Sequence, residues 1–146
     1  LLYAAGLAAL LTWSFFIEGW PQRPLGDFAS MHPQLGNGLR AIIVIGFVGA
    51  LIVHTILQRL LAMIDTVRDG DPFILQNAQR LNAIAWSLLA LEVLRMMVTT
   101  IASAVWESGR LGGFSFTPWM AVLLLFVLSG VFAQGARMRA DLEGTV

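Results

Sequence analysis

The chain has 146 residues, of which 58% are hydrophobic and 12% are charged, against roughly a quarter charged in soluble domains. Nine arginines balance nine acidic residues, so no net charge favours direct binding of nucleic acid, and the lack of cysteine excludes disulfides, thiolate metal sites and cysteine nucleophiles. With a mean hydropathy of +0.76, this composition predicts an integral membrane protein in contact with the lipid bilayer.

Four apolar runs are predicted to be membrane-spanning helices: residues 1–17, 39–63, 81–105 and 114–133. Each approaches the roughly 20 residues that a helix needs to cross about 30 Å of hydrocarbon. The first run starts with the sequence itself, so we expect a short segment to precede it. Because lipid offers the backbone no hydrogen-bond partners, the runs predict one all-α domain, an integral membrane four-helix bundle.

The segment between the first two runs, residues 18–38, is predicted to be a loop. It contains three of the five prolines, together with several glycines. Residues of these two types mark turns, so this segment is not expected to form a domain.

The most polar segment joins the second and third runs, and it predicts a tight turn. Gly70 can take the left-handed conformation that ends a helix, Asp71 can cap the next helix, and Pro72 fits that helix's first position. A helix from Pro72 to Glu107 would have about 36 residues and a length of about 54 Å, some 24 Å more than the hydrocarbon needs. Helices two and three are therefore expected to extend into an amphipathic hairpin at residues 64–80.

Two sets of side chains give this hairpin its amphipathic pattern. The apolar ones are expected to pack between the two arms, and they are Ile64, Val67, Phe73, Ile74 and Leu81. The polar ones are expected to face outward, and they are Arg68, Asp69, Gln76, Gln79 and Arg80.

The arginines predict the orientation in the membrane. On the hairpin side lie Arg59, Arg68, Arg80, Arg137 and Arg139, against Arg23, Arg40 and Arg110 on the other side. By the positive-inside rule, the hairpin, the tail at residues 134–146 and both termini are expected in the cytoplasm, in a cytoplasmic (inner) membrane.

Three ionisable residues lie within the predicted spans: His54, Glu92 and Arg95. Charged groups at this depth need a partner or water, and His54 and Glu92 are expected at nearly the same depth. They form either a proton or ligand site or a polar cluster that fixes the helix register. A transporter usually has more such groups and broken spans, which disfavours the first interpretation.

No motif for catalysis, a cofactor or a metal is found. The sequence lacks a nucleophile elbow, a phosphate loop and a metalloprotease helix, and Asp65, Asp69 and Asp71 do not follow the calcium-loop spacing. A haem would need a second intramembrane histidine besides His54. We therefore expect a protein without enzymatic activity.

Asn77 and Arg80 share one face at the start of the third helix, which allows two interpretations. They are either solvated, or Arg80 bonds to the carbonyls that end helix two or to a carboxylate of the tail, Asp141 or Glu143. The second arrangement would lock the hairpin against the tail.

Small residues four apart could bring helices together within the bundle or between copies. These pairs are Ala5 with Ala9, Gly46 with Ala50, and Ser129 with Ala133.

Several of these residues together carry a family resemblance. The run Gly70-Asp71-Pro72-Phe73 is followed by Asn77 and Arg80-Leu81, and the last span ends in Phe132-Ala-Gln-Gly135 before a tail that closes in Thr145-Val146. This pattern resembles the bacterial four-span membrane proteins of the domain of unknown function 2975, over nearly the whole chain. The resemblance brings no catalytic residues. Because many members are encoded beside a small helix-turn-helix transcription regulator, it implies such a regulator as a cytoplasmic partner.

The leading functional hypothesis is a non-enzymatic regulatory or interaction protein whose hairpin and tail contact a soluble partner. One alternative is a small-molecule or ion-handling membrane protein that uses His54, Glu92 and Arg95. Another is a subunit of a larger membrane complex, docked through the face of Gly46 and Ala50.

Overall fold

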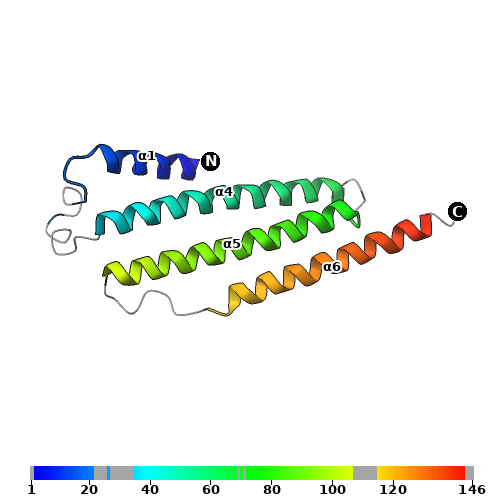
Figure 1. Ribbon diagram of the computed structural model, residues 1–146. Helices are drawn as coiled ribbons and strands as arrows, with labels where there is room; N and C mark the ends of the chain where they lie inside the picture. Colours follow the sequence, from blue (N-terminus) through cyan, green and yellow to red (C-terminus); the bar gives the residue numbers. More distant parts are fainter. Residues whose placement is uncertain are drawn as a thin grey trace. The chain divides into compact units, whose positions relative to one another are not determined.

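The computed structural model describes residues 2–21, 26, 35–68, 70, 72–106 and 115–143, with side chains at all of these positions except 105, 106 and 143. These described residues form helices α1 (Leu2–Phe16), α4 (Leu35–Arg68), α5 (Leu75–Trp106) and α6 (Thr117–Glu143), shown in Figure 1. The prediction of an all-α protein is confirmed.

Helices α4, α5 and α6 are each long and apolar enough to cross a membrane, whereas α1 is a shorter apolar helix of 15 residues. On α6, the large side chains of Leu123, Leu124 and Val127 are all more than half exposed. Proteins in water rarely leave such a continuous apolar surface uncovered. The three long helices thus indicate a membrane protein.

Helix α4 begins earlier than the sequence predicts, because residues 35–38 are helical and not part of the loop. Leu35 is fully buried, and a Cβ on Gly36 would lie 3.1 Å from Cδ of Pro21. This close approach requires the small residue. Packing against Pro21 therefore offsets the cost of glycine in a helix, about 1 kcal/mol per residue.

The helices pack in two units, and the first contains Leu1–Ile52 and Val93–Phe114. In this unit α1 runs antiparallel to α4, since Ser14 lies beside Arg40 and Leu7 lies beside Gly46. Nη2 of Arg40 donates a hydrogen bond of 2.7 Å to the carbonyl of Ser14, and its guanidinium lies 4.5 Å from the ring centroid of Phe15. The Gly46 face of α4 is thus in contact with α1.

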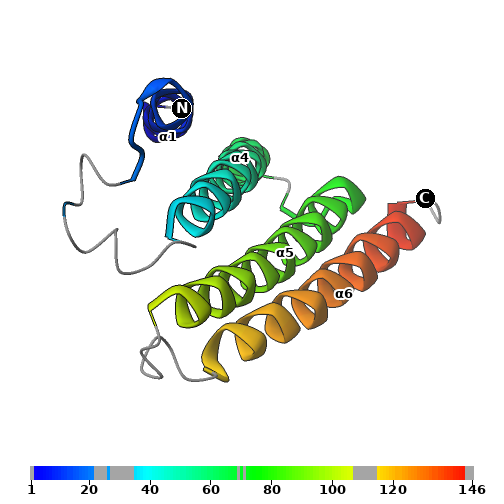
Figure 2. The same ribbon diagram turned by 60° about the vertical axis from the view of Figure 1, so that its left-hand side comes forward.

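The second unit contains Val53–Glu92 and Ser115–Val146, and the candidate site lies in it. Antiparallel pairing of α4 with α5 follows from the contact of Ala62 with Arg80 and that of Arg59 with Ser87. Helix α6 lies antiparallel beside the first half of α5, as Figures 1 and 2 both show. Two aromatic pairs hold α6 in this place: Phe73, in the turn before α5, with Phe132 at 5.2 Å, and Trp86 of α5 with Phe126 at 5.4 Å between ring centroids.

The turn that joins α4 to α5, which we call the hairpin turn, partly follows the prediction. Gly70 has the expected left-handed conformation with φ of 82°, and its amide donates to the carbonyl of Val67 at 3.1 Å. Asp71 lies outside the described residues. The prediction that Pro72 starts the next helix is wrong, because α5 begins at Leu75 and the carbonyl of Ile74 accepts its first backbone hydrogen bonds.

The predicted apolar packing between the two arms is also wrong in part. Ile64 and Val67 are 53% and 55% exposed, and Phe73 packs on α6. Leu81 is buried as expected. The reason is that polar contacts involving Thr66 occupy the interface between the arms near the turn.

Candidate functional site

Asn77 is the centre of a polar network at the hairpin turn. Its side chain is fully buried in the first turns of α5. Its Nδ2 donates to the hydroxyl of Thr66 on α4 at 2.7 Å and to the carbonyl of Pro72 at 3.0 Å, while its Oδ1 accepts from Nη1 of Arg80 at 3.0 Å. Both amide protons and one acceptor site of this side chain are therefore used, as a buried amide requires.

Arg80 and Thr66 extend this network onto the backbone of α4. Nη1 of Arg80 also donates to the carbonyl of Ala62 at 2.9 Å, and the hydroxyl of Thr66 donates to the carbonyl of Met63 at 2.7 Å. The hydrogen bonds thus connect the last turns of α4 to the first turns of α5. The interpretation of Asn77 and Arg80 as solvated residues is wrong, because both side chains bond across the two arms.

Helix α6 packs against the same turn through Phe73. The Phe73 ring stacks at a tilt on Phe132, and a Cβ on Gly135 would lie 3.2 Å from its Cδ1. Since α6 ends at Glu143, it runs eight residues past Gly135, about 12 Å at 1.5 Å per residue. The last two turns of α6 therefore reach beyond the level of Phe73.

A hollow of about 350 Å³ lies between the hairpin turn and these last turns of α6. Its lining residues, which define it here, are Phe73, Ile74, Leu75, Ala136, Arg137, Arg139 and Ala140. Successive residues of a helix are about 100° apart, so Ala136 and Ala140 form one stripe and the two arginines flank it on either side. The hollow therefore combines an apolar floor with two cationic edges.

The predicted contacts of Arg80 are met in part. Arg80 bonds to the carbonyl of Ala62 and to Asn77, so the predicted bond to helix two is present. Asp141 is exposed near the end of α6, and Arg80 makes no bond to it, whereas the side chain of Glu143 lies outside the described residues. A bond from Arg80 to Glu143 stays a prediction.

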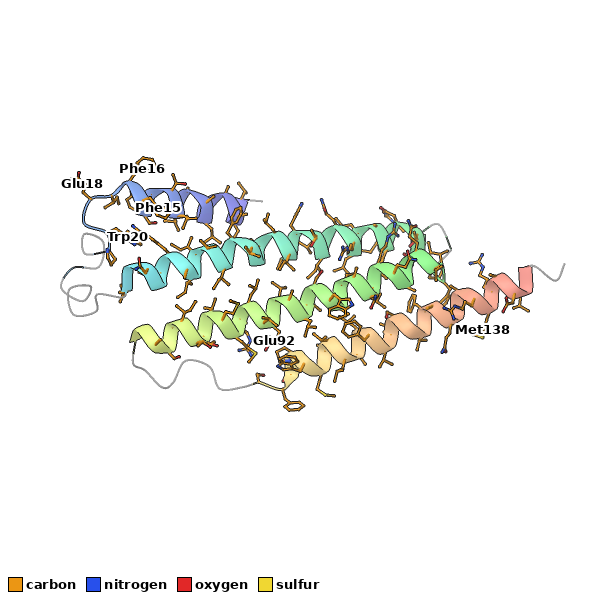
Figure 3. The ribbon with its side chains drawn as sticks, viewed as in Figure 1. Phe15, Phe16, Glu18, Trp20, Glu92 and Met138 are labelled. Carbon is orange, nitrogen blue, oxygen red and sulfur yellow. The ribbon has the colours of Figure 1, made fainter. Side chains whose placement is uncertain are left out.

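The three ionisable residues of the spans differ in their surroundings. Glu92 is 5% exposed and continues the buried stripe of α5 that includes Asn77, Leu81 and Ala85. In Figure 3, Glu92 lies on the side of α5 that faces α6. His54 is half-buried in the same unit, whereas Arg95 belongs to the other unit.

The register of the two helices gives the level of His54. The pairs Thr66 with Asn77 and Ala62 with Arg80 place it level with about residue 89, within one turn of Glu92. On α4, however, His54 lies about 140° around the helix from Arg59, the residue whose side chain bonds to α5.

Within the described residues, no group of three or more histidine or acidic side chains is arranged to hold a metal ion.

The family model described as Protein of unknown function (DUF2975) matches residues 5–146, nearly the whole chain. The chain belongs to this family. A search of the curated proteins and a search of the solved structures gave no match. The resemblance noted around the hairpin turn and the end of the last span is thereby confirmed. The DUF2975 description assigns no activity.

Sequence reasoning missed several residues of this DUF2975 site. Thr66 and Ala62 bind the side chains of Asn77 and Arg80, and Phe132 and Gly135 hold α6 against the turn. Thr66 could have been selected from its hydroxyl, four residues before Gly70, because a buried asparagine needs a hydrogen-bond partner nearby. No local pattern indicates a backbone carbonyl such as that of Ala62 as a partner.

Proposed function

We propose that this DUF2975 protein is a non-enzymatic membrane protein that binds a soluble cytoplasmic partner through its hairpin turn and the last turns of α6. What carries the proposal is the end of α6, which reaches past the hairpin turn with two large apolar side chains uncovered. Met138 is 63% and Leu142 is 71% exposed. Figure 3 shows Met138 on the side of α6 turned away from α5.

The chemistry of this surface favours a basic partner. Met138 and Leu142 are four residues apart and share one helix face, about 160° around from the alanine stripe of the hollow. Two acidic residues, Asp141 and Glu143, are the neighbours of Leu142 in the sequence. An apolar pair beside acidic groups suits a surface that is itself basic around an apolar patch, as DNA-binding proteins often are. A helix-turn-helix regulator, the partner implied by the family resemblance, meets this description.

The polar network explains how the surface would be held in place. Asn77, Arg80 and Thr66 tie the two arms together, and Phe73 then gives α6 a fixed contact. A preorganised surface binds with a smaller entropy cost than a mobile one. In this proposal the turn lies at the cytoplasmic surface of the membrane, where a soluble partner can reach it.

Site-specific photo-cross-linking in the native host tests the proposal. A photoreactive residue at Met138 or Leu142 should cross-link a helix-turn-helix regulator that mass spectrometry identifies. Leu124 is the matched control, because it is 68% exposed on the same helix but lies within the apolar run. The proposal is wrong if neither position captures a regulator, or if Leu124 captures it equally well.

A second candidate function is ion handling, and the burial of Glu92 favours it. A carboxyl group that is 5% exposed inside an apolar span is costly and often marks a proton or ion pathway. Proteoliposomes that contain a pH-sensitive dye would test this. Proton entry faster than in protein-free vesicles should be lost in Glu92→Gln and kept in Asp65→Asn, whose carboxylate is exposed on α4. Equal rates in Glu92→Gln and the unmodified protein would leave Glu92 with a structural role.

A further inference from the structure

We propose that the hollow between the hairpin turn and α6 binds an anionic phospholipid of the surrounding bilayer. The inference does not rest on the proposed partner, because it concerns the opposite face of the α6 end. It rests on the lining of the hollow, on its depth relative to the apolar run of α6, and on its size.

The lining matches the two chemical parts of such a lipid. Phe73, Ile74 and Leu75 come from the hairpin turn, and the alanine stripe comes from α6. These groups suit the first methylenes of an acyl chain. Arg137 and Arg139 stand on the two sides of the stripe, and guanidinium groups bind phosphate oxygens through paired hydrogen bonds. A zwitterionic lipid carries a cationic group beside its phosphate and would fit this pair of arginines less well.

The depth of the arginines agrees with the headgroup layer. The apolar run of α6 ends at Ala133, so Arg137 and Arg139 lie about 6 and 9 Å further along the helix axis. The headgroup layer on each side of a bilayer is about 5 to 7 Å thick, and arginine side chains bend toward it. The phosphates of the lipid therefore lie within reach of both guanidinium groups.

The size of the hollow disfavours a protein segment as its occupant. A volume of about 350 Å³ is at the low end of the range for small-molecule pockets, roughly 300 to 1,000 Å³. Two turns of a helix about 10 Å wide would occupy more than twice that volume. A lipid headgroup with its first methylenes is a better match.

The test compares the lipids that the full chain retains. The protein is reconstituted in bilayers of three parts phosphatidylcholine to one part phosphatidylglycerol, extracted in mild detergent, and its bound lipids are counted by mass spectrometry. Phosphatidylglycerol should be enriched over phosphatidylcholine, and the enrichment should fall about tenfold when Arg137→Gln and Arg139→Gln are combined. Arg68→Gln is the matched control, because Arg68 is exposed near the same turn but does not line the hollow.

A second variant removes space and leaves the charges in place. Ala140→Phe fills the hollow with both arginines present and should also abolish the enrichment, with the helical content of the protein unchanged. An equal loss in Arg68→Gln, or no enrichment in the unmodified protein, would overturn the inference. The inference would also be overturned if a soluble protein from the native host were retained through Arg137 and Arg139 while the retention of phosphatidylglycerol did not depend on these arginines. Unchanged recovery of the regulator from the Met138 and Leu142 variants, together with the expected lipid enrichment, would count against the partner alone.

Discussion

The side-chain amide of Asn77 donates a hydrogen bond of 2.7 Å to the hydroxyl of Thr66, and this bond joins the start of α5 to the end of α4. The two residues are 11 positions apart, with the hairpin turn between them. Because Asn77 is fully buried, each group that it binds would lose this hydrogen bond with no water to replace it if the amide were removed. The network is therefore expected to hold the turn in one conformation.

Asn77→Ala should destabilise the protein by about 1 to 3 kcal/mol, the cost of leaving buried polar groups without partners. The free energy of unfolding can be measured by titrating the purified protein with a denaturing detergent. Asn82→Ala is the control, because Asn82 is exposed on the same helix, and its effect should stay within about 0.5 kcal/mol. Equal effects at the two positions would show that the network adds nothing to stability.

Thr66→Val keeps the shape of the side chain but removes the hydroxyl that accepts from Asn77. In a double-mutant cycle with Asn77→Ala, the two changes should couple by about 0.5 to 3 kcal/mol, since they remove the same hydrogen bond. Additive effects would mean that the bond is not formed in the membrane. Thr100→Val, on an exposed position of α5, should show no coupling with Asn77→Ala.

Gly135→Ala and Gly130→Ala test the contact of α6 with the hairpin turn. A Cβ at Gly130 meets nothing within 4 Å, whereas one at Gly135 would lie 3.2 Å from Phe73. Alanine favours a helix over glycine by about 1 kcal/mol, so Gly130→Ala should gain up to that amount in unfolding free energy. Gly135→Ala should gain less or lose stability. Equal gains at both positions would contradict the packing of Phe73 on α6.

Single cysteines test the orientation, because the chain contains no cysteine of its own. Gln76→Cys, at an exposed position beside the hairpin turn, should react with a membrane-impermeant thiol reagent from the cytoplasmic side. Ser115→Cys, just before α6, should react from the opposite side. The same pattern reversed would place the hairpin turn outside the cytoplasm and remove the basis for a cytoplasmic partner.

The sequence predicts the helices and the position of the turn because both follow from local properties. Long apolar runs define the spans, and Gly70 defines the end of α4 through a backbone conformation that suits glycine. The start of α4 at Leu35 was missed because it depends on packing against Pro21, which is 14 positions away along the chain. Helix propensity alone cannot indicate that two glycines will be helical.

The candidate site was predictable in its residues more than in its contacts. Asn77 and Arg80 were selected from the sequence, but the burial of Asn77 and its bond to Thr66 depend on the antiparallel register of α4 and α5. The hollow escaped prediction because its two walls come from segments about 60 residues apart, and apolar periodicity gives no information on such pairings.

The central claim, that the end of α6 binds a soluble regulator, is tested most directly by what co-purifies with the full-length protein from its own host. The unmodified protein is compared with a variant that combines Met138→Ser and Leu142→Ser, and with Gln134→Ser, which changes another exposed residue of α6. We expect a helix-turn-helix regulator with the unmodified protein and with Gln134→Ser, and its loss from the double variant. Equal recovery from all three proteins, or no regulator with any of them, would contradict the claim.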